Sequence, residues 1–169
     1  MEEAAAGDPR VREWIAEKLL FQGLTPQQLE RVAEIIKVRD VQADEVIVHE
    51  RDYGDSLFLI DRGEVEVCVA SPEGDRSVAT LNAPSPGEIS YEGDFFGEMC
   101  LLDLEPRCAT ITAREPCRLW EINRDELYWL FGDDKELQLR ILLTVARVLS
   151  RRLARMDAAT ATGAQKRVS

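Results

Sequence analysis

The sequence predicts a mainly β domain with helices at both ends, in which the strands form a β-sandwich or a jelly roll. Between residues 41 and 123, apolar and polar side chains alternate in short runs that are separated by turn-forming residues. Before and after this segment the apolar period becomes helical. A chain of 169 residues is long enough for one such domain with a sizeable core.

Two helices are expected between residues 8 and 40, after a polar and acidic start over residues 1–7 that we expect to be disordered. Asp8 is suited to cap the first helix, because a proline follows it at the first helical position. The second helix is expected to begin after Thr25, since Gln28 three positions later completes a capping box.

Short runs rich in β-branched residues make up the central segment, which we assign to a β-roll over residues 41–123. They are VIVH (46–49), SLFLI (56–60), EVEVCVA (64–70), RSVATLNA (76–83), CATITA (108–113) and CRLWEI (117–122). Many short strands at regular spacing are typical of two packed sheets.

The C-terminal part, residues 124–157, is expected to form a short helix followed by a long helix over residues 135–156. Apolar residues of the long helix follow a heptad seam of two repeats: Leu142, Ala146, Leu149, Leu153 and Met156. Such a seam either packs on the β-roll or joins two copies of the chain, and the pattern leaves both open. The small, polar tail over residues 158–169 is expected to be disordered.

Charge and composition argue against several classes of protein. The net charge is −11, yet eight basic residues stand against two acidic ones from residue 135 onward, and the first 134 residues hold 13 basic and 30 acidic ones. The acidic body, residues 1–134, disfavours DNA as a partner, and we interpret the basic residues from 135 onward as the solvated face of a helix.

No apolar run is long enough to span a membrane. The cysteines lack CxxC spacing, which favours free thiols and a cytoplasmic protein: Cys68, Cys100, Cys108 and Cys117.

Catalysis is not indicated either. His49 is the single histidine, so neither a histidine metal cluster nor a nucleophile–histidine pair is suggested, and no cofactor is expected. Only 13 residues follow Met156, which is too few for a helix-turn-helix. We therefore expect a protein that is not an enzyme and does not read DNA.

The stretch FGEMCLLDLEPRCAT, residues 96–110, holds one acid, Glu98, and one arginine, Arg107, in an apolar context. A single buried helical turn is expected here, and Gly97 would let a ligand approach the backbone. Arg107 offers a fork for a phosphate, and Glu98 can only accept hydrogen bonds, for example from a hydroxyl. A structural ion pair between Glu98 and Arg107 is the alternative.

The FGE motif, the apolar run after it and LEPRCAT resemble the phosphate-binding cassette of the cyclic nucleotide-binding domain family, as found in catabolite activator proteins, protein kinase A regulatory subunits and cyclic-nucleotide-gated channels. YGDSLFLIDRGEVEV (53–67) resembles the family's first strands, and the resemblance covers roughly residues 18–156. It implies a jelly-roll-like β-roll with a cassette at 94–110, flanked by helices that move when one cyclic nucleotide binds.

The resemblance also implies roles for individual residues. Glu98 would accept from the ribose 2′-hydroxyl, and Arg107 would clamp the cyclic phosphate. Backbone N–H groups would add phosphate contacts at Met99, Cys100, Cys108 and Ala109. Candidate walls for the base are Val67, Val78 and Leu81, although the last two are three apart and face opposite sides of a regular strand unless a bulge intervenes. On the last helix, Arg152 or Leu153 would be the lid residue.

The family resemblance favours cAMP over cGMP, because Cys108 stands where cGMP-binding members often have a threonine. The sequence departs from the family pattern in two respects. Asp44 and Arg51 stand where the family commonly has turn glycines, and the segment 82–93, which links a strand to the cassette, is longer than usual.

We therefore expect a cyclic nucleotide sensor or regulatory module whose C-terminal helices signal to a partner. The partner is an effector protein or an effector domain outside this sequence, and a homodimer through residues 142–156 is a further option. The alternative is a domain of this fold that no longer binds nucleotide and serves as a protein interaction module.

Overall fold

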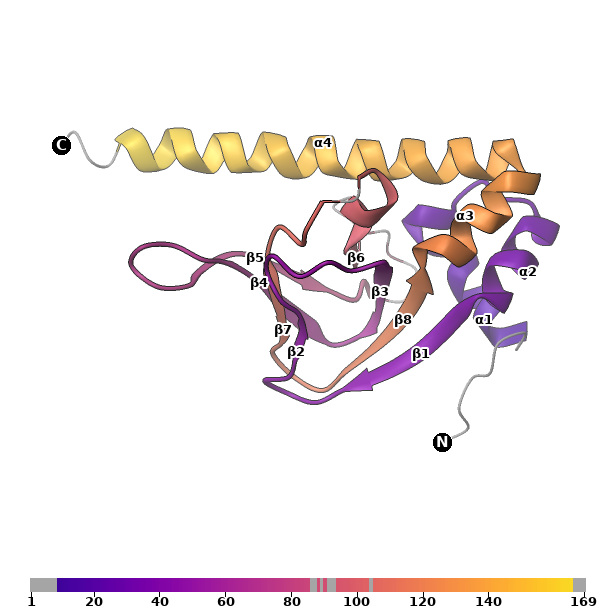
Figure 1. Cartoon of the computed structure of the whole chain (residues 1–169), viewed down its shortest axis with the longest axis horizontal. Coiled ribbons are helices and arrows are strands. Elements are labelled where there is room, and N and C mark those ends of the chain that lie inside the picture. The colour runs from indigo at the N-terminus through magenta and orange to yellow at the C-terminus, as the bar shows by residue number, and fades with distance from the viewer. Residues whose placement is uncertain (1–8, 86–87, 89, 91–93, 104, 166–169) are drawn as a thin grey trace.

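The computed structural model describes residues 9–85, 88, 90, 94–103 and 105–165, and it confirms a mainly β fold with helices at both ends (Figure 1). Within these residues the strands are β1 (Ile36–Val41), β2 (Val46–Val48), β3 (Ser56–Arg62), β4 (Glu64–Val69), β5 (Arg76–Asn82), β6 (Phe95–Phe96), β7 (Thr110–Ala113) and β8 (Cys117–Asn123). They form two antiparallel four-stranded sheets, in the orders β1-β8-β3-β6 and β2-β7-β4-β5.

The N-terminal part contains α1 (Pro9–Ala16), the 3₁₀ turn η1 (Leu19–Phe21) and α2 (Pro26–Glu34). The predicted capping box is confirmed, since Thr25 and Gln28 exchange side-chain and backbone hydrogen bonds of 2.9 and 3.2 Å. The predicted helical range of 8–40 is wrong at its end, because β1 already begins at Ile36. Pairing of β1 with β8 along its whole length outweighs the helical spacing of the apolar residues there.

The C-terminal part contains α3 (Arg124–Asp133) and α4 (Lys135–Gln165), as expected for a short helix followed by a long one. The predicted disorder of residues 158–169 is wrong up to Gln165, where α4 ends. Extending a helix costs far less than starting one, and the alanines of this stretch favour helix. Residues 1–8, which include the predicted cap Asp8, and residues 166–169 lie outside the described residues.

Two apolar layers hold these elements together. One lies between the two sheets, and the other lies between the first sheet and the helices. Strand β3 is buried on both faces, because Leu57 and Leu59 face the helices while Phe58 and Ile60 lie in the layer between the sheets. This explains why LFLI (57–60) is continuously apolar rather than alternating.

Helix α4 packs on the body through one row of residues and runs beyond the sheets at its C-terminal end (Figure 1). The buried row is Leu137, Ile141, Val145 and Val148. The predicted heptad seam is a neighbouring row, in which Leu142 and Leu149 are partly buried against the core while Leu153 and Met156 are 61% and 59% exposed. Across the described part of the chain, none of the helices combines the length and apolar character of a membrane span.

Candidate functional site

The predicted helical turn follows directly on the short strand β6. Phe95 of this strand packs in the layer under the helices, and Phe96 packs between the sheets, stacked on Phe58 at 5.1 Å between ring centroids. The next residue, Gly97, has a φ of 81°, and the 3₁₀ turn η2 (Glu98–Leu101) begins after it. Two buried aromatic rings on opposite faces of one sheet thus fix where the turn starts.

Arg107 returns to the start of this turn from the other side of the cassette. Its Nη1 donates to the carbonyl oxygen of Gly97 at 3.1 Å, and its Nη2 donates to that of Ser56 at 2.7 Å. These bonds use only part of the guanidinium's donors. A Cβ on Gly97 would lie 2.7 Å from both Arg107 Nη1 and the Ser56 carbonyl oxygen, so glycine is required here for space as well as for its φ.

Glu98 has a different partner from the one considered in the ion-pair alternative. Its side chain is 7% exposed, and its Oε1 accepts from Arg152 Nη1 of α4 at 2.7 Å. Arg152 Nη2 also donates to the carbonyl oxygen of Phe95 at 2.6 Å, and its guanidinium lies 5.3 Å from the centre of the Phe95 ring. Glu98 and Arg107 therefore sit at the same glycine with separate partners, which argues against the alternative of an ion pair between them.

Of the two residues predicted for the lid, the structure brings Arg152 to the cassette and leaves Leu153 61% exposed. A second contact joins the C-terminal helices to the cassette, because the Tyr128 hydroxyl of α3 donates to the Leu101 carbonyl oxygen at 2.5 Å. Both C-terminal helices are thus hydrogen-bonded to the segment that holds Glu98.

The residues predicted as walls lie on β4 and β5. A register shift between these strands leaves Val78 without a cross-strand partner, which is the bulge that a shared face for Val78 and Leu81 would require. Val67 and Leu81 pack against the layer between the sheets, whereas Val78 is 37% exposed.

The residues predicted to contribute backbone N–H groups differ in exposure. Met99 is 38% exposed, Cys108 is exposed, Ala109 is half-buried, and Cys100 is buried. Burial raises the pKa of the Cys100 thiol to about 11. None of these side chains is needed for a contact made by the backbone.

Sequence reasoning missed a buried ion pair at the start of the cassette. Lys18 Nζ lies 3.2 Å from Asp94 Oδ2, and the two side chains are 7% and 2% exposed. Lys18 also lies 4.1 Å from the centre of the Trp14 ring, which stacks on Trp120 at 4.1 Å. The N-terminal helical part is thereby attached to the strand that leads into the cassette. An aspartate four positions before the turn η2 gives no sequence signal for this.

The turn between β2 and β3 was also missed as part of the site. Arg51 N–H donates to the Arg107 carbonyl oxygen at 2.9 Å, and Arg107 N–H donates to the Asp52 carbonyl oxygen at 2.8 Å. Asp44 and Arg51, at positions where the family resemblance leads us to expect turn glycines, adopt positive φ values of 66° and 71°. Both turns thus have the backbone conformation that glycine adopts most easily, although neither residue is a glycine.

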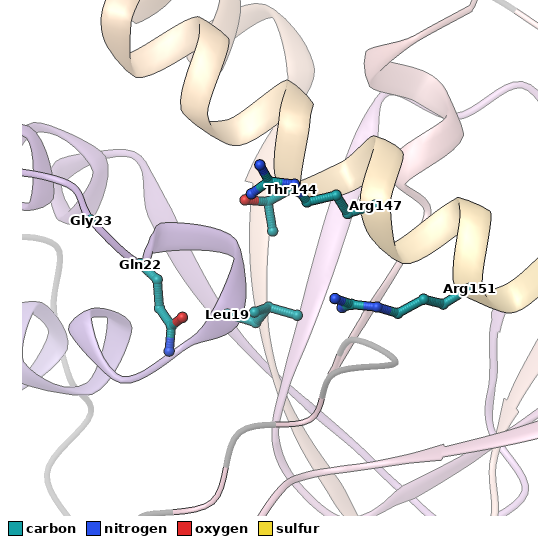
Figure 2. Close-up of a pocket in the computed structure, with 6 residues that line it drawn as sticks. All are labelled: Leu19, Gln22, Gly23, Thr144, Arg147 and Arg151. Carbon is teal, nitrogen blue, oxygen red and sulfur yellow. The ribbon is translucent and has the colours of Figure 1, made fainter.

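A hollow lies elsewhere, between η1 and α4 (Figure 2). It is lined by Leu19, Gln22, Gly23, Thr144, Arg147 and Arg151, and so contains none of the residues predicted for nucleotide binding. Among the described residues, no group of His, Cys, Asp and Glu side chains is arranged to hold a metal ion.

Comparison with known proteins shows the family to which this fold belongs. The model of the family described as "Cyclic nucleotide-binding domain" matches residues 38–134, from β1 to the end of α3. The chain belongs to the cyclic nucleotide-binding domain family. The match includes Glu98 and Arg107, whereas α4 with Arg152 lies outside the matched residues.

Regulatory proteins are among the relatives. A cAMP-dependent protein kinase regulatory subunit of Mycosarcoma maydis is 32% identical over 120 residues, which cover 68% of this chain and 22% of that protein. A CRP-like cAMP-activated global transcriptional regulator of Mycobacterium tuberculosis is 29% identical and is matched over 86% of this chain and 59% of its own length. A cGMP-dependent protein kinase of Eimeria tenella is 30% identical over 80% of this chain and 12% of its own. The chain thus spans only part of these relatives.

Solved structures of the family have the same fold. The catabolite activator protein of Thermus thermophilus superimposes with a TM-score of 0.69 at 26% identity, over 87% of this chain and 63% of that one. A cyclic nucleotide-binding domain from Methylobacillus flagellatus gives a TM-score of 0.73 at 24% identity, over 86% and 81% of the two chains. The expected jelly-roll-like β-roll is confirmed.

Proposed function

We propose that this chain binds a cyclic nucleotide at residues 94–110 and acts as a sensor or regulatory module rather than as an enzyme. The observation that carries the proposal is the meeting of Arg107 and Glu98 at Gly97: Arg107 bonds to the carbonyl of Gly97, and Glu98 is the next residue. A guanidinium suits a cyclic phosphate, and a carboxylate suits a ribose hydroxyl. One ligand that carries both groups satisfies both side chains.

cAMP is the preferred ligand in this proposal. The residue after the phosphate arginine is Cys108, whose sulfur is a weak acceptor for the amino group of guanine. A single missing hydroxyl contact is worth about 1 kcal/mol, so the preference is modest. Val67 and Leu81 would contribute the wall beside the base, and the bulged Val78 would lie at its rim.

Signalling would pass through α4. Glu98 accepts from Arg152 in the structure, and a ribose hydroxyl at Glu98 would compete for the same carboxylate. A ligand shifts a conformational equilibrium only through contacts that differ between the two states, and this carboxylate supplies such a difference. Movement of α4 would also reshape the hollow that it shares with η1 and would change how the heptad seam of residues 142–156 is presented.

In this proposal, a second protein or domain receives the signal. An effector chain, an effector domain beyond this sequence or a second copy joined through residues 142–156 would detect the position of α4. The acidic body disfavours DNA as a direct partner of this segment. Free thiols and the relation to kinase and transcription regulators favour the cytoplasm as its location.

A second candidate function is a protein interaction module without a nucleotide. It is favoured by the fact that both charged groups already have protein partners: two carbonyl oxygens for Arg107 and Arg152 for Glu98. Hydrogen bonds of this kind within the protein would stabilise the two charged groups even if no ligand ever binds.

Calorimetric titration distinguishes the two candidates. After removal of any nucleotide that copurifies, cAMP and cGMP are titrated into the wild-type chain, Arg107→Ala and the control Arg118→Ala, which removes an ion pair with Asp40 on β1. We expect micromolar or tighter binding that Arg107→Ala weakens by about 2–4 kcal/mol, roughly 30- to 1,000-fold. Arg118→Ala should bind like the wild type. No heat with either nucleotide would favour the interaction module.

A further inference from the structure

The guanidinium of Arg107 lies directly against Gly54, in the turn between β2 and β3. A Cβ on Gly54 would be 2.5 Å from Nε, 2.5 Å from Nη2 and 2.7 Å from Cζ of Arg107. Contacts this short are not tolerated between non-bonded atoms, so a side chain at residue 54 and the observed position of Arg107 exclude one another.

Backbone conformation does not explain the glycine. Gly23, Gly63, Gly74 and Gly97 are the glycines with positive φ in the described chain, and Gly54 is not among them. The sign of φ therefore does not require a glycine at this position. What Gly54 provides is space, and the group that fills this space is the guanidinium of Arg107.

The same turn also fixes the main chain of Arg107. Its N–H and C=O groups are bonded to Asp52 and Arg51, at 2.8 and 2.9 Å. The backbone of Arg107 is thus held by one side of the turn, while Gly54 leaves room for the side chain to reach the carbonyl oxygens of Ser56 and Gly97. The turn determines both where the arginine starts and where its charged group lies.

We propose that Gly54 is a positioning residue for the phosphate arginine, so that the turn over residues 51–54 forms a second half of the nucleotide site. This inference rests on the proposed function. Gly54 acts through Arg107 and need not touch the nucleotide. A methyl group at residue 54 would push the guanidinium out of its two carbonyl contacts, and because Arg107 is a flexible side chain, the fold would survive while the charge moved away from Gly97.

The test is a double-mutant cycle read by cAMP titration. Gly54→Ala should weaken cAMP binding at least tenfold in the wild-type background and change it by less than twofold in the Arg107→Ala background. The control is Gly132→Ala in α3, where an added Cβ would meet nothing within 4 Å and affinity should not change. Wild-type affinity in Gly54→Ala, or an equal loss in both backgrounds, would overturn the proposal.

A ligand-free measurement separates this inference from the proposed function. In urea unfolding, Gly54→Ala should lower stability when Arg107 is present and have a smaller effect in Arg107→Ala. The shorter Arg107→Lys should show intermediate coupling. If the wild-type chain binds neither nucleotide, the proposed function fails, and the unfolding cycle still decides whether Gly54 positions Arg107: coupling supports it, and additive effects overturn it.

Discussion

Glu98 Oε1 accepts a hydrogen bond from Arg152 Nη1 at 2.7 Å, and this contact joins the cassette to a helix that begins at Lys135. Glu98 is nearly buried, and the guanidinium of Arg152 is the charged group that compensates its carboxylate. Arg152 also bonds to the Phe95 carbonyl, one residue before the aromatic ring that stacks between the sheets. The position of α4 is therefore tied to the carboxylate that, in the proposed function, accepts from a ribose hydroxyl.

Removing Arg152 should loosen the end of α4. We expect Arg152→Ala to lower the free energy of unfolding by about 1–3 kcal/mol, because it leaves the Glu98 carboxylate without its arginine partner. Chymotrypsin should cleave after Leu149 or Leu153 faster than in the wild type. The matched control is Arg147→Ala, which changes an arginine of α4 that lines the hollow beside η1. Equal cleavage rates in the two variants would contradict a role for Arg152 in holding the helix.

The proposed role of Glu98 can be tested with a ligand that lacks the ribose 2′-hydroxyl. Glu98→Gln should weaken cAMP binding by about 1.5–3 kcal/mol, since a charged acceptor for the ribose hydroxyl is lost. With 2′-deoxy-cAMP, which lacks that hydroxyl, wild type and Glu98→Gln should bind almost equally in calorimetry. If the substitution weakens both ligands to the same extent, Glu98 does not bind the 2′-hydroxyl.

The buried pair of Lys18 and Asp94 should matter more for stability than an exposed pair. Lys18→Met leaves a buried carboxylate alone, which typically costs about 3–5 kcal/mol. The control is Lys37→Met, whose ion pair with Glu126 is exposed on both sides and is worth about 0–1 kcal/mol. Urea unfolding measures both. A loss in Lys18→Met no larger than in Lys37→Met would show that the buried pair contributes little.

The cysteines should differ in reactivity. Burial raises the pKa of Cys100, Cys68 and Cys117, so these thiols are held in the unreactive protonated form around neutral pH. Stability linked to these raised values is present below the pKa of the unfolded thiols and is lost as pH rises through the folded pKa, which for Cys100 means towards about 11. The expected result is one fast equivalent of alkylation, at the exposed Cys108.

Nucleotide should protect this fast thiol, because Cys108 follows Arg107, which we propose to bind the cyclic phosphate. Mass spectrometry of the alkylated peptide, with and without cAMP, checks both statements, and Cys108→Ser should abolish the fast phase. Fast labelling of Cys100 in the folded protein, or labelling of Cys108 that saturating cAMP leaves unchanged, would contradict this account.

Local sequence signals predicted what is determined locally. The capping box at Thr25, the strands of the central segment and the helical turn before Leu102 were all visible because a few neighbouring residues decide them. The strand at Ile36 was missed, since only pairing with β8 reveals it. The C-terminal extension of α4 was missed because its polar composition suggested a tail.

In the candidate site, too, the residues of a local motif were predicted, and the contacts between distant parts of the chain were not. Glu98 and Arg107 were found from the motif, whereas the groups that hold them come from distant parts of the chain. Ser56 and Gly54 meet Arg107 only because β3 lies beside β6, and Lys18 reaches Asp94 only because the N-terminal helical part packs under the first sheet. Tertiary contacts of this kind leave no periodicity in the sequence.

Hydrogen exchange of α4 with and without saturating cAMP tests the central claim most directly. The account predicts that amide exchange around Val148–Met156 changes on binding in the wild type and stays unchanged in Arg107→Ala at the same cAMP concentration. Binding shown by calorimetry without any change of exchange in α4 would contradict the claim that the cassette signals through Glu98 and Arg152.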